Sequence, residues 1–318
     1  MLTCAFAVVL ALGLQQPPAP ATPPVAAPQG DLKLVLAADR AEYVVGDDVQ
    51  AEVTLTNGST KDQEVAELCF DERSLSFEIV FGDSKKKFDL SIVRPDPHLA
   101  ERLALPRVAL KPGKSVITLV RFPVLARGPL QITGVYRGSD KELRAAALTV
   151  TVKPQADGGD RLAAVVETSQ GTFQVDLKPE DAPNNVSNFV SLARRGFYRN
   201  MNFHRVVKNE WIQSGCPYDN GYGSVGYALK SEAGAQANLH EAGSVAMSGN
   251  MKEGYTGSQF YVCLRKSPGF DKKYPIIGVV AGAGLDVVKK IGAVEVDKTT
   301  DRPKEDVRLK DIKIIVQK

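Results

Sequence analysis

The sequence predicts a mostly β protein in two domains, a β-sandwich followed by a closed β-barrel with helices at its ends. Its length of 318 residues suggests two domains rather than one. Short alternating apolar segments separated by turn residues fill residues 31–153, without any segment of helical period. Two segments of helical period then appear among further strands, after a polar linker at residues 154–160.

The first 30 residues differ in composition from the rest of the chain. The run Cys4–Leu14 is apolar and too short to span a bilayer, but it suits the core of a signal peptide, although no basic residue precedes it. We interpret residues 1–14 as a signal-like segment of an exported protein (periplasmic, secreted or on the cell surface). The alternative is a hydrophobic N-terminal tail. Residues 15–30 are rich in proline and alanine and predict an extended spacer.

Charge and cysteine content narrow the possible partners. Forty basic residues oppose 37 acidic ones, so no strong field favours a nucleic-acid partner, and no integral membrane span is expected in the mature chain. The four cysteines (Cys4, Cys69, Cys216 and Cys263) form no CxxC motif and no cluster with the three histidines. A structural zinc site or disulfide framework is therefore not expected, while one disulfide remains open. We expect no metal and no cofactor.

Residues 31–153 have the pattern of a β-sandwich. Val49, Ala51, Val53 and Leu55 alternate along one strand, which stops at the turn signal Asn57-Gly58. Leu75 to Phe81 alternates again, and SVITLVRFPV, LQITGVYRG and ALTVTV follow. The stretch EYVVGDDVQAEVTLTNGS resembles the opening of bacterial immunoglobulin-like domains, and it carries no catalytic motif.

Residues 161–318 begin with a predicted hairpin that turns near residues 169–171. A helix starts at Pro183, buries a stripe of apolar residues and ends at Gly196; the stripe comprises Val186, Phe189, Val190 and Ala193. Strands dominate again until GLDVVKKIG, where Leu285, Val288 and Ile291 mark a second short helix. Two helices among many strands predict a closed barrel with helical ends.

The stretch FHRVVKNEWIQSG, residues 203–215, carries the candidate chemistry. If it forms a hairpin turning around Lys208-Asn209, Arg205 lies directly across from Gln213, with Cβ atoms ~5 Å apart. Val207 then faces Trp211 on the same side. The result is a guanidinium oriented by an amide on an otherwise apolar face. An exposed arginine on a barrel surface is the alternative interpretation of this stretch alone.

Five ordered segments around this hairpin resemble the cyclophilins. They are FHRVV...WIQSG, DNGYGSVGYALKSE, HEAGSVAMS, GSQFYV and FDKKYPIIGVVAGAGLDVVKKI, and they follow a helix similar to APxxVxNFxxLA. The resemblance covers residues 161–318, half of the chain. It implies the family fold, an eight-stranded antiparallel β-barrel capped by two helices.

The resemblance also implies site residues. Arg205 is identified as the catalytic arginine and Gln213 as its partner. The implied substrate-binding residues are Phe203, Trp211, Met247, Ser248, Gly249, Gln259, Tyr261, Phe270 and Tyr274. Three positions depart from the family pattern: Glu210 stands where a pocket phenylalanine is usual, Gly269 stands where many members have tryptophan, and Tyr274 replaces a common histidine. Trp211 and Phe270 are the neighbours that could supply the missing rings.

The implied function is that of a peptidyl-prolyl cis-trans isomerase that acts on proline-containing polypeptide segments and assists protein folding outside the cytoplasm. The N-terminal sandwich would recruit clients, bind a protein partner or act as a spacer. The main alternative is a cyclophilin-like peptide-binding module or chaperone with little or no turnover, which Glu210 and Gly269 favour. A third hypothesis makes the sandwich the functional part, in surface or matrix adhesion.

Overall fold

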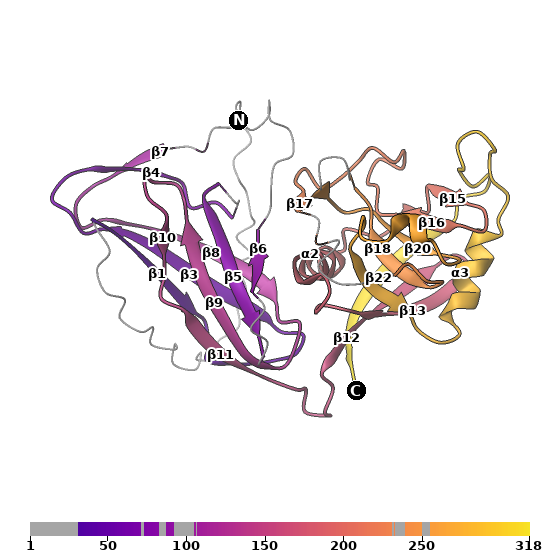
Figure 1. The fold of residues 1–318 in the computed structure, drawn as a ribbon, viewed down its shortest axis with the longest axis horizontal. Helices are drawn as coiled ribbons and strands as arrows, with labels where there is room; N and C mark the ends of the chain where they lie inside the picture. Colours follow the sequence, from indigo (N-terminus) through magenta and orange to yellow (C-terminus); the bar gives the residue numbers. More distant parts are fainter. Residues whose placement is uncertain are drawn as a thin grey trace.

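The computed structural model shows two β-rich domains side by side (Figure 1). It describes residues 31–70, 73–82, 87–91, 105, 107–230, 232, 239–249 and 255–318. The signal-like segment and the spacer expected at residues 1–14 and 15–30 lie outside these residues. No helix within the described ranges is long and apolar enough to cross a membrane.

The N-terminal domain is built from two sheets that pack on each other. Its strands are β1 (Leu32–Ala38), β2 (Glu42–Val44), β3 (Asp48–Asn57), β4 (Gln63–Ala66), β5 (Leu75–Phe81), β6 (Phe88–Leu90), β7 (Arg107–Leu110), β8 (Ser115–Pro123), β9 (Gly128–Tyr136), β10 (Leu143–Arg144) and β11 (Leu148–Lys153). One sheet has the order β1-β3-β8 and the other β2-β11-β9-β5-β6, with β10 on β9 and a separate β4-β7 pair. The alternation predicted for β3 is confirmed, because its four apolar residues from Val49 to Leu55 are all fully buried.

The C-terminal domain is a sheet that closes on itself. Its strands are β12 (Arg161–Thr168), β13 (Gly171–Leu177), β14 (Met201–Asn202), β15 (Arg205–Val207), β16 (Trp211–Ser214), β17 (Leu229–Lys230), β18 (Ser244–Met247), β19 (Tyr255–Thr256), β20 (Phe260–Cys263), β21 (Ile276–Val280) and β22 (Arg308–Gln317). The order β14-β22-β12-β13-β21-β18-β20-β16-β15 contains nine strands where eight were expected. The two edge strands, β14 and β15, are consecutive in the chain and separated only by residues 203–204. They act as one interrupted strand, which closes the barrel.

Two α-helices accompany the barrel, as the sequence predicts. Helix α2 (Pro183–Arg194) buries the whole predicted stripe, and Gly196 follows it with φ of 71°, a left-handed conformation that glycine adopts without strain. Helix α3 (Gly284–Gly292) buries Val288 and Ile291. A short 3₁₀ turn, η1 (Pro268–Phe270), lies before β21 and was not predicted.

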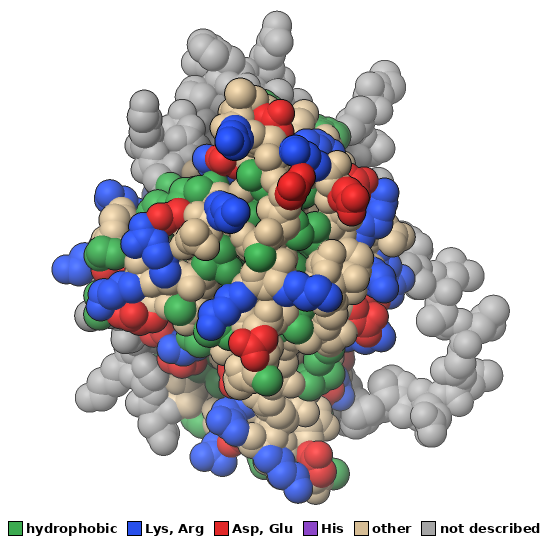
Figure 2. Space-filling model, turned by 90° about the vertical axis from the view of Figure 1, so that its right-hand side faces the viewer, with side chains coloured by type: hydrophobic (Ala, Val, Ile, Leu, Met, Phe, Trp, Pro, Cys, Tyr) green, Lys and Arg blue, Asp and Glu red, His purple; other side chains and the backbone are tan. Residues whose placement is uncertain are grey.

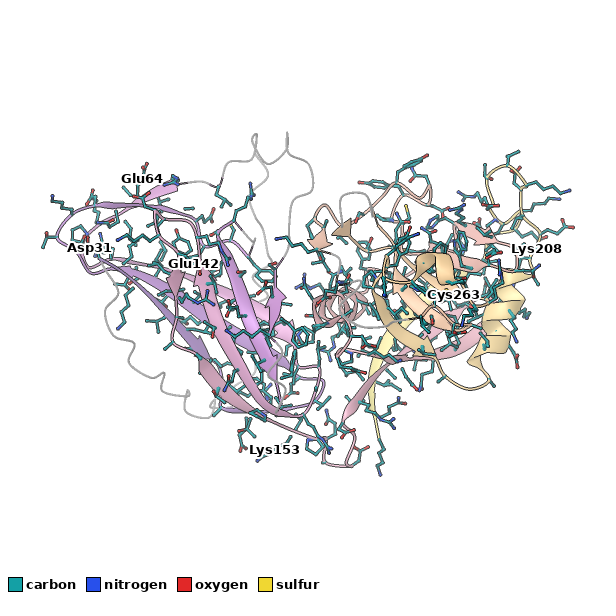
Figure 3. The ribbon with its side chains drawn as sticks, viewed as in Figure 1. Asp31, Glu64, Glu142, Lys153, Lys208 and Cys263 are labelled. Atoms are coloured by element: carbon teal, nitrogen blue, oxygen red, sulfur yellow. The ribbon has the colours of Figure 1, made fainter. Side chains whose placement is uncertain are left out.

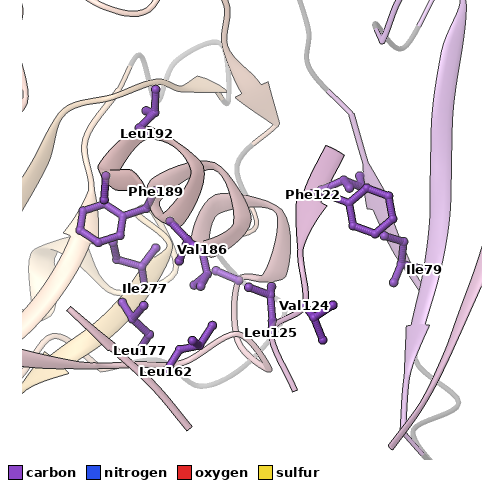
Figure 4. Packing of buried hydrophobic residues seen from close by; sticks show 14 of the residues in the cluster. Ile79, Phe122, Val124, Leu125, Leu162, Leu177, Val186, Phe189, Leu192 and Ile277 are labelled. Atoms are coloured by element: carbon purple, nitrogen blue, oxygen red, sulfur yellow. The ribbon is translucent and has the colours of Figure 1, made fainter. Parts of the chain in front are cut away.

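The two domains share a packed boundary. Helix α2 contacts β6 and β8 of the sandwich, and one cluster of buried apolar residues extends from Ile79 and Phe122 through Leu125 to Val186 (Figure 4). The contact is close, since a Cβ placed on Gly46 would lie 2.7 Å from Val316 Cγ2 of the barrel. The sandwich is therefore fixed against the barrel by more than the linker that joins them.

Candidate active site

The hairpin β15–β16 has the register that the sequence predicts. Arg205 pairs with Gln213 and Val207 pairs with Trp211. Asn209 in the turn has φ of 63°, the left-handed region that asparagine tolerates better than most residues. Lys208 of the same turn lies at the end of the barrel away from the sandwich residues Asp31 and Glu142 (Figure 3). The tip of this hairpin is therefore at the end of the barrel remote from the N-terminal domain.

Arg205 has a partner that the sequence did not indicate. Its Nε and Nη2 atoms donate to the same Oδ2 of Asp301, at 3.2 and 3.1 Å. The guanidinium carbon also lies 5.4 Å from the centre of the Trp211 ring. The Arg205 side chain is half-exposed, at 45%, and so remains accessible beside the aromatic ring.

The sequence predicts a contact between the Arg205 and Gln213 side chains, and the structure shows other partners for both. Gln213 Nε2 donates instead to Gln259 Oε1 at 2.9 Å and to Ser248 Oγ at 3.4 Å. The two side chains share a face by register, but a carboxylate accepts from a guanidinium more strongly than a neutral amide does. Arg205 therefore pairs with Asp301, and Gln213 bonds to Ser248 and Gln259, which lie just outside β18 and β20.

Gln259 links this hairpin to the following loop. Its Nε2 donates to the carbonyl oxygens of Gly221 and Gly223, at 2.7 and 2.9 Å. The backbone N–H of Ser248 in turn donates to the carbonyl of Gln259 at 2.8 Å. Gln213, Gln259 and Ser248 thus form one hydrogen-bonded group, and it holds the loop of residues 216–223 against the barrel.

Aromatic side chains form a second apolar cluster next to this polar group. Tyr261 is buried at its base, and Trp211, Phe270 and Tyr274 are half-buried around it. The ring centres of Trp211 and Phe270 are 5.1 Å apart, and Tyr261 lies 5.5 and 5.6 Å from Phe270 and Tyr274. These edge-to-face contacts are the arrangement that aromatic rings prefer. The cluster provides an apolar wall next to Arg205.

His240 and Asp271 support the base of this wall. The Tyr261 hydroxyl lies 3.0 Å from His240 Nε2, and His240 Nδ1 lies 3.1 Å from Asp271 Oδ1. Burial lowers the pKa of His240, while the pKa of Asp271 is lowered chiefly by the backbone N–H of His240, which donates to it. A neutral His240 that donates from Nδ1 leaves Nε2 to accept from the tyrosine hydroxyl. The predicted site residues included neither His240, which is buried, nor Asp271, which is partly exposed.

Two predicted substrate-binding residues lie elsewhere. Phe203 and Met247 are 1% and 0% exposed and belong to the main barrel core. The break between β14 and β15 removes Phe203 from the alternation that it would otherwise share with Arg205. On β18 it is Ala246, next to Met247, that belongs to the aromatic cluster. Phe203 and Met247 therefore pack beneath the site. Gly249 is exposed beside Ser248.

Glu210 and Gly269, two of the positions that depart from the family pattern, do not belong to the aromatic cluster. Glu210 forms an ion pair with Arg265. Gly269 has no atom within 4 Å of the place where its Cβ would be, so a larger side chain would have room there. On the face of the barrel turned away from the sandwich, basic and acidic side chains are interspersed with apolar ones (Figure 2). No single sign of charge dominates that face.

His204 and three cysteines are the other described residues of the kinds considered for the site. His204 is buried in the break between β14 and β15, and burial lowers its pKa to about 4. Cys69, Cys216 and Cys263 form no disulfide.

Comparison with known proteins places the C-terminal half among relatives. Residues 163–314 match the family model described as cyclophilin type peptidyl-prolyl cis-trans isomerase/CLD. A peptidyl-prolyl cis-trans isomerase of Helicobacter pylori is 40% identical over 129 residues, covering 40% of this chain and 78% of the relative. Isomerase CYP18-2 of Arabidopsis thaliana is 37% identical over 152 residues, covering 47% of this chain and 92% of the relative.

Solved structures similar to this chain include a cyclophilin-type isomerase of Cryptosporidium parvum. It is 24% identical and covers 50% of this chain and 98% of its own, with a TM-score of 0.46. A second structure of that protein was obtained in the presence of the dipeptide Ala-Pro, with a TM-score of 0.45.

Proposed function

Because the chain belongs to the cyclophilin-type peptidyl-prolyl cis-trans isomerases through its C-terminal half, we propose that Arg205 is the residue with which it promotes rotation of Xaa-Pro bonds. The observation that carries the proposal is the accessible guanidinium of Arg205, held beside the aromatic wall and across from Gln213.

The reaction requires little chemistry from the protein. The barrier to rotation, ~18–20 kcal/mol, comes from conjugation of the amide, and uncatalysed exchange takes roughly tens to hundreds of seconds. In the twisted transition state the prolyl nitrogen loses this conjugation and becomes a better hydrogen-bond acceptor. A guanidinium donor at that nitrogen therefore stabilises the twisted state more than either planar state, which is what lowers the barrier.

The surrounding residues have complementary roles in this proposal. The wall of Tyr261, Trp211, Phe270 and Tyr274 would hold the apolar proline ring while the preceding carbonyl turns. Gln259, with its neighbours Gln213 and Ser248, would bind the backbone of the polypeptide on either side of the proline. Arginine suits the central position because it stays charged at every relevant pH and has five donors.

The variant Arg205→Ala tests the proposal. We expect it to lose most of the isomerase activity, about 10²–10³-fold in rate, as is typical when a transition-state donor is removed. The side chain is half-exposed, so its truncation should leave the fold intact. Arg205→Lys should recover only part of the rate, because one ammonium cannot replace the planar fork of donors.

The measurement is exchange NMR of an Xaa-Pro peptide with wild type and both variants, with circular dichroism as the check on folding. If Arg205→Ala isomerises the peptide as fast as wild type, Arg205 does not have this role. If wild type binds the peptide without turnover above background, the chain is a binding module instead.

We further propose that the protein works outside the cytoplasm. The apolar run Cys4–Leu14 and the Pro/Ala-rich segment after it support export, and both lie outside the described residues. Determination of the N-terminal residue of the chain recovered from expressing cells tests this proposal, because a cleaved signal would remove the apolar run.

A further inference from the structure

The ion pair between Arg205 and Asp301 restricts the guanidinium in a specific way. Of the five N–H donors of an arginine, the pair uses the one on Nε and one on Nη2. Both hydrogens on Nη1 and one on Nη2 remain for another acceptor. A carboxylate that accepts from the Nε edge fixes the plane of the guanidinium without covering its far end.

The backbone of Asp301 is itself held in place next to Arg205. Its carbonyl accepts from the N–H of Val206, the residue after Arg205, at 2.7 Å, and its own N–H donates to the carbonyl of Asp297 at 2.9 Å. The Asp297 carboxylate accepts from the Thr299 hydroxyl and from the N–H groups of Thr299 and Thr300, the latter two at 2.8 and 3.1 Å, and these bonds lower its pKa to about 2. The segment 297–301 is thus a compact turn that is bonded to strand β15.

A second connection ties this turn to the loop beside the site. Arg302 Nη1 donates to the carbonyl of Asp219 at 2.7 Å, and its Nη2 forms an ion pair with the Asp219 carboxylate. Asn202, at the end of β14, also donates to that carboxylate at 2.9 Å. Asp301 is therefore presented from a turn that is fixed on two sides.

From this geometry we infer that Asp301 is a positioning residue for the isomerase reaction, which sets the orientation of the Arg205 guanidinium before a polypeptide binds. The inference rests on the role proposed above for Arg205. The residue acts through Arg205 and needs no contact with the polypeptide.

The physical reason lies in the entropy of a long side chain. Arg205 and Asp301 are 45% and 33% exposed, and an ion pair this exposed contributes little to folding stability. An unrestrained arginine, however, loses considerable rotational freedom when it must point at one atom, so restraint in advance lowers the cost of reaching the transition state. The Trp211 ring, 5.4 Å from the guanidinium carbon, limits its movement further.

The backbone of Asp301 decides which variants are informative. Its φ of 57° is in the left-handed region, where alanine would be strained but asparagine and glycine are accepted. Asp301→Asn removes the charge and keeps the shape, and Asp301→Gly removes the side chain without strain. Asp306→Asn is the matched control, because it removes a carboxylate from an exposed ion pair with Arg308 in the same part of the chain.

We expect Asp301→Asn and Asp301→Gly to slow the exchange of a bound Xaa-Pro peptide by roughly 10- to 100-fold, the range associated with a misplaced catalytic group. The dissociation constant of the peptide and the thermal unfolding midpoint should stay close to those of wild type, and Asp306→Asn should leave all three quantities unchanged. In an Arg205→Ala background, Asp301→Asn should cause no further loss, because its effect passes through Arg205.

Three results would overturn the inference. The Asp301 variants could catalyse exchange as fast as wild type or faster, or Asp301→Asn could reduce the rate by the same factor in the wild-type and Arg205→Ala backgrounds. The third is a loss of rate that is accompanied by an equivalent loss of thermal stability. A faster variant would mean that the carboxylate competes with the substrate for the guanidinium. If Asp301→Asn is neutral while Arg205→Ala is inactive, only this inference fails. If Arg205→Ala keeps full activity, the proposed role of Arg205 fails first.

Discussion

At the scale of single residues, the aromatic wall depends on a hydrogen bond beneath it. The Tyr261 hydroxyl is buried, and burial raises its pKa, so it remains a neutral donor to His240 Nε2. Asp271 holds the other ring nitrogen of His240 and belongs to the segment that also carries Phe270 and Tyr274. One buried histidine therefore joins the base of the wall to its rim.

Replacing Tyr261 by phenylalanine should destabilise the protein by about 1–3 kcal/mol, because His240 Nε2 would be left buried without its donor. Urea unfolding of Tyr261→Phe at neutral pH measures the effect. Tyr274→Phe removes the same hydroxyl from a half-buried ring of the same wall and should cost clearly less. Equal losses in the two variants would show that the bond between Tyr261 and His240 contributes nothing specific.

At the scale of elements, helix α2 begins without a capping side chain of its own. Its N-cap residue is Ala182, and no side chain in its first turn is acidic. The Glu232 carboxylate, far along the sequence, accepts instead from the N–H groups of Asn184 and Asn185, at 3.1 and 2.8 Å. A negative charge here satisfies free N–H groups and interacts favourably with the helix dipole.

Glu232→Ala should therefore lower the free energy of unfolding by about 1–2 kcal/mol, as the loss of a helix cap does. Glu232→Gln keeps one acceptor oxygen without the charge, so its free energy of unfolding should lie between those of wild type and Glu232→Ala. Thermal unfolding at low salt measures both, with the exposed Glu295→Ala as control. A Glu232→Ala variant as stable as Glu295→Ala would mean that water replaces this cap at no cost.

At the scale of the whole molecule, the domain boundary is less simple than a linker between two independent parts. Helix α2 packs on the sandwich, where Asn184 Nδ2 donates to the carbonyl of Ser91 at 3.1 Å. Arg194, at the end of the helix, forms an ion pair with Asp48 at 2.6 Å and donates to the carbonyl of Gly46. The barrel, however, closes through its own strands and uses none from the sandwich.

A fragment of residues 161–318 should consequently fold cooperatively but unfold at a lower temperature than the full chain, since the face of α2 that contacts β6 and β8 becomes exposed to water. Calorimetry of the fragment and the full chain measures this difference. The fragment should keep its isomerase activity, because the hairpin of Arg205 and Lys208 reaches the end of the barrel remote from the sandwich (Figure 3). A fragment that does not fold would contradict the division at residues 154–160.

The sequence by itself determined the features that depend on local pattern. The period of two along β3, the apolar stripe of α2 and the register that places Arg205 across from Gln213 all follow from neighbouring residues and the turn between them. The two domains and the members of the aromatic wall could be predicted too, the latter from the resemblance to a known family.

Only the tertiary structure decided which distant groups meet. Asp301 is 96 residues from Arg205 in sequence, and no local pattern indicates that its carboxylate, rather than Gln213, would be the partner of the guanidinium. No local pattern indicates that Glu232 would cap α2, or that the sandwich would pack against that helix. Phe203 and Met247 lie in the core and not in the predicted site. The strand break before β15 sets the side of the barrel wall that Phe203 occupies, and the alternation along β18 sets the side that Met247 occupies. Such contacts depend on how the barrel closes, and closure is a property of the whole sheet.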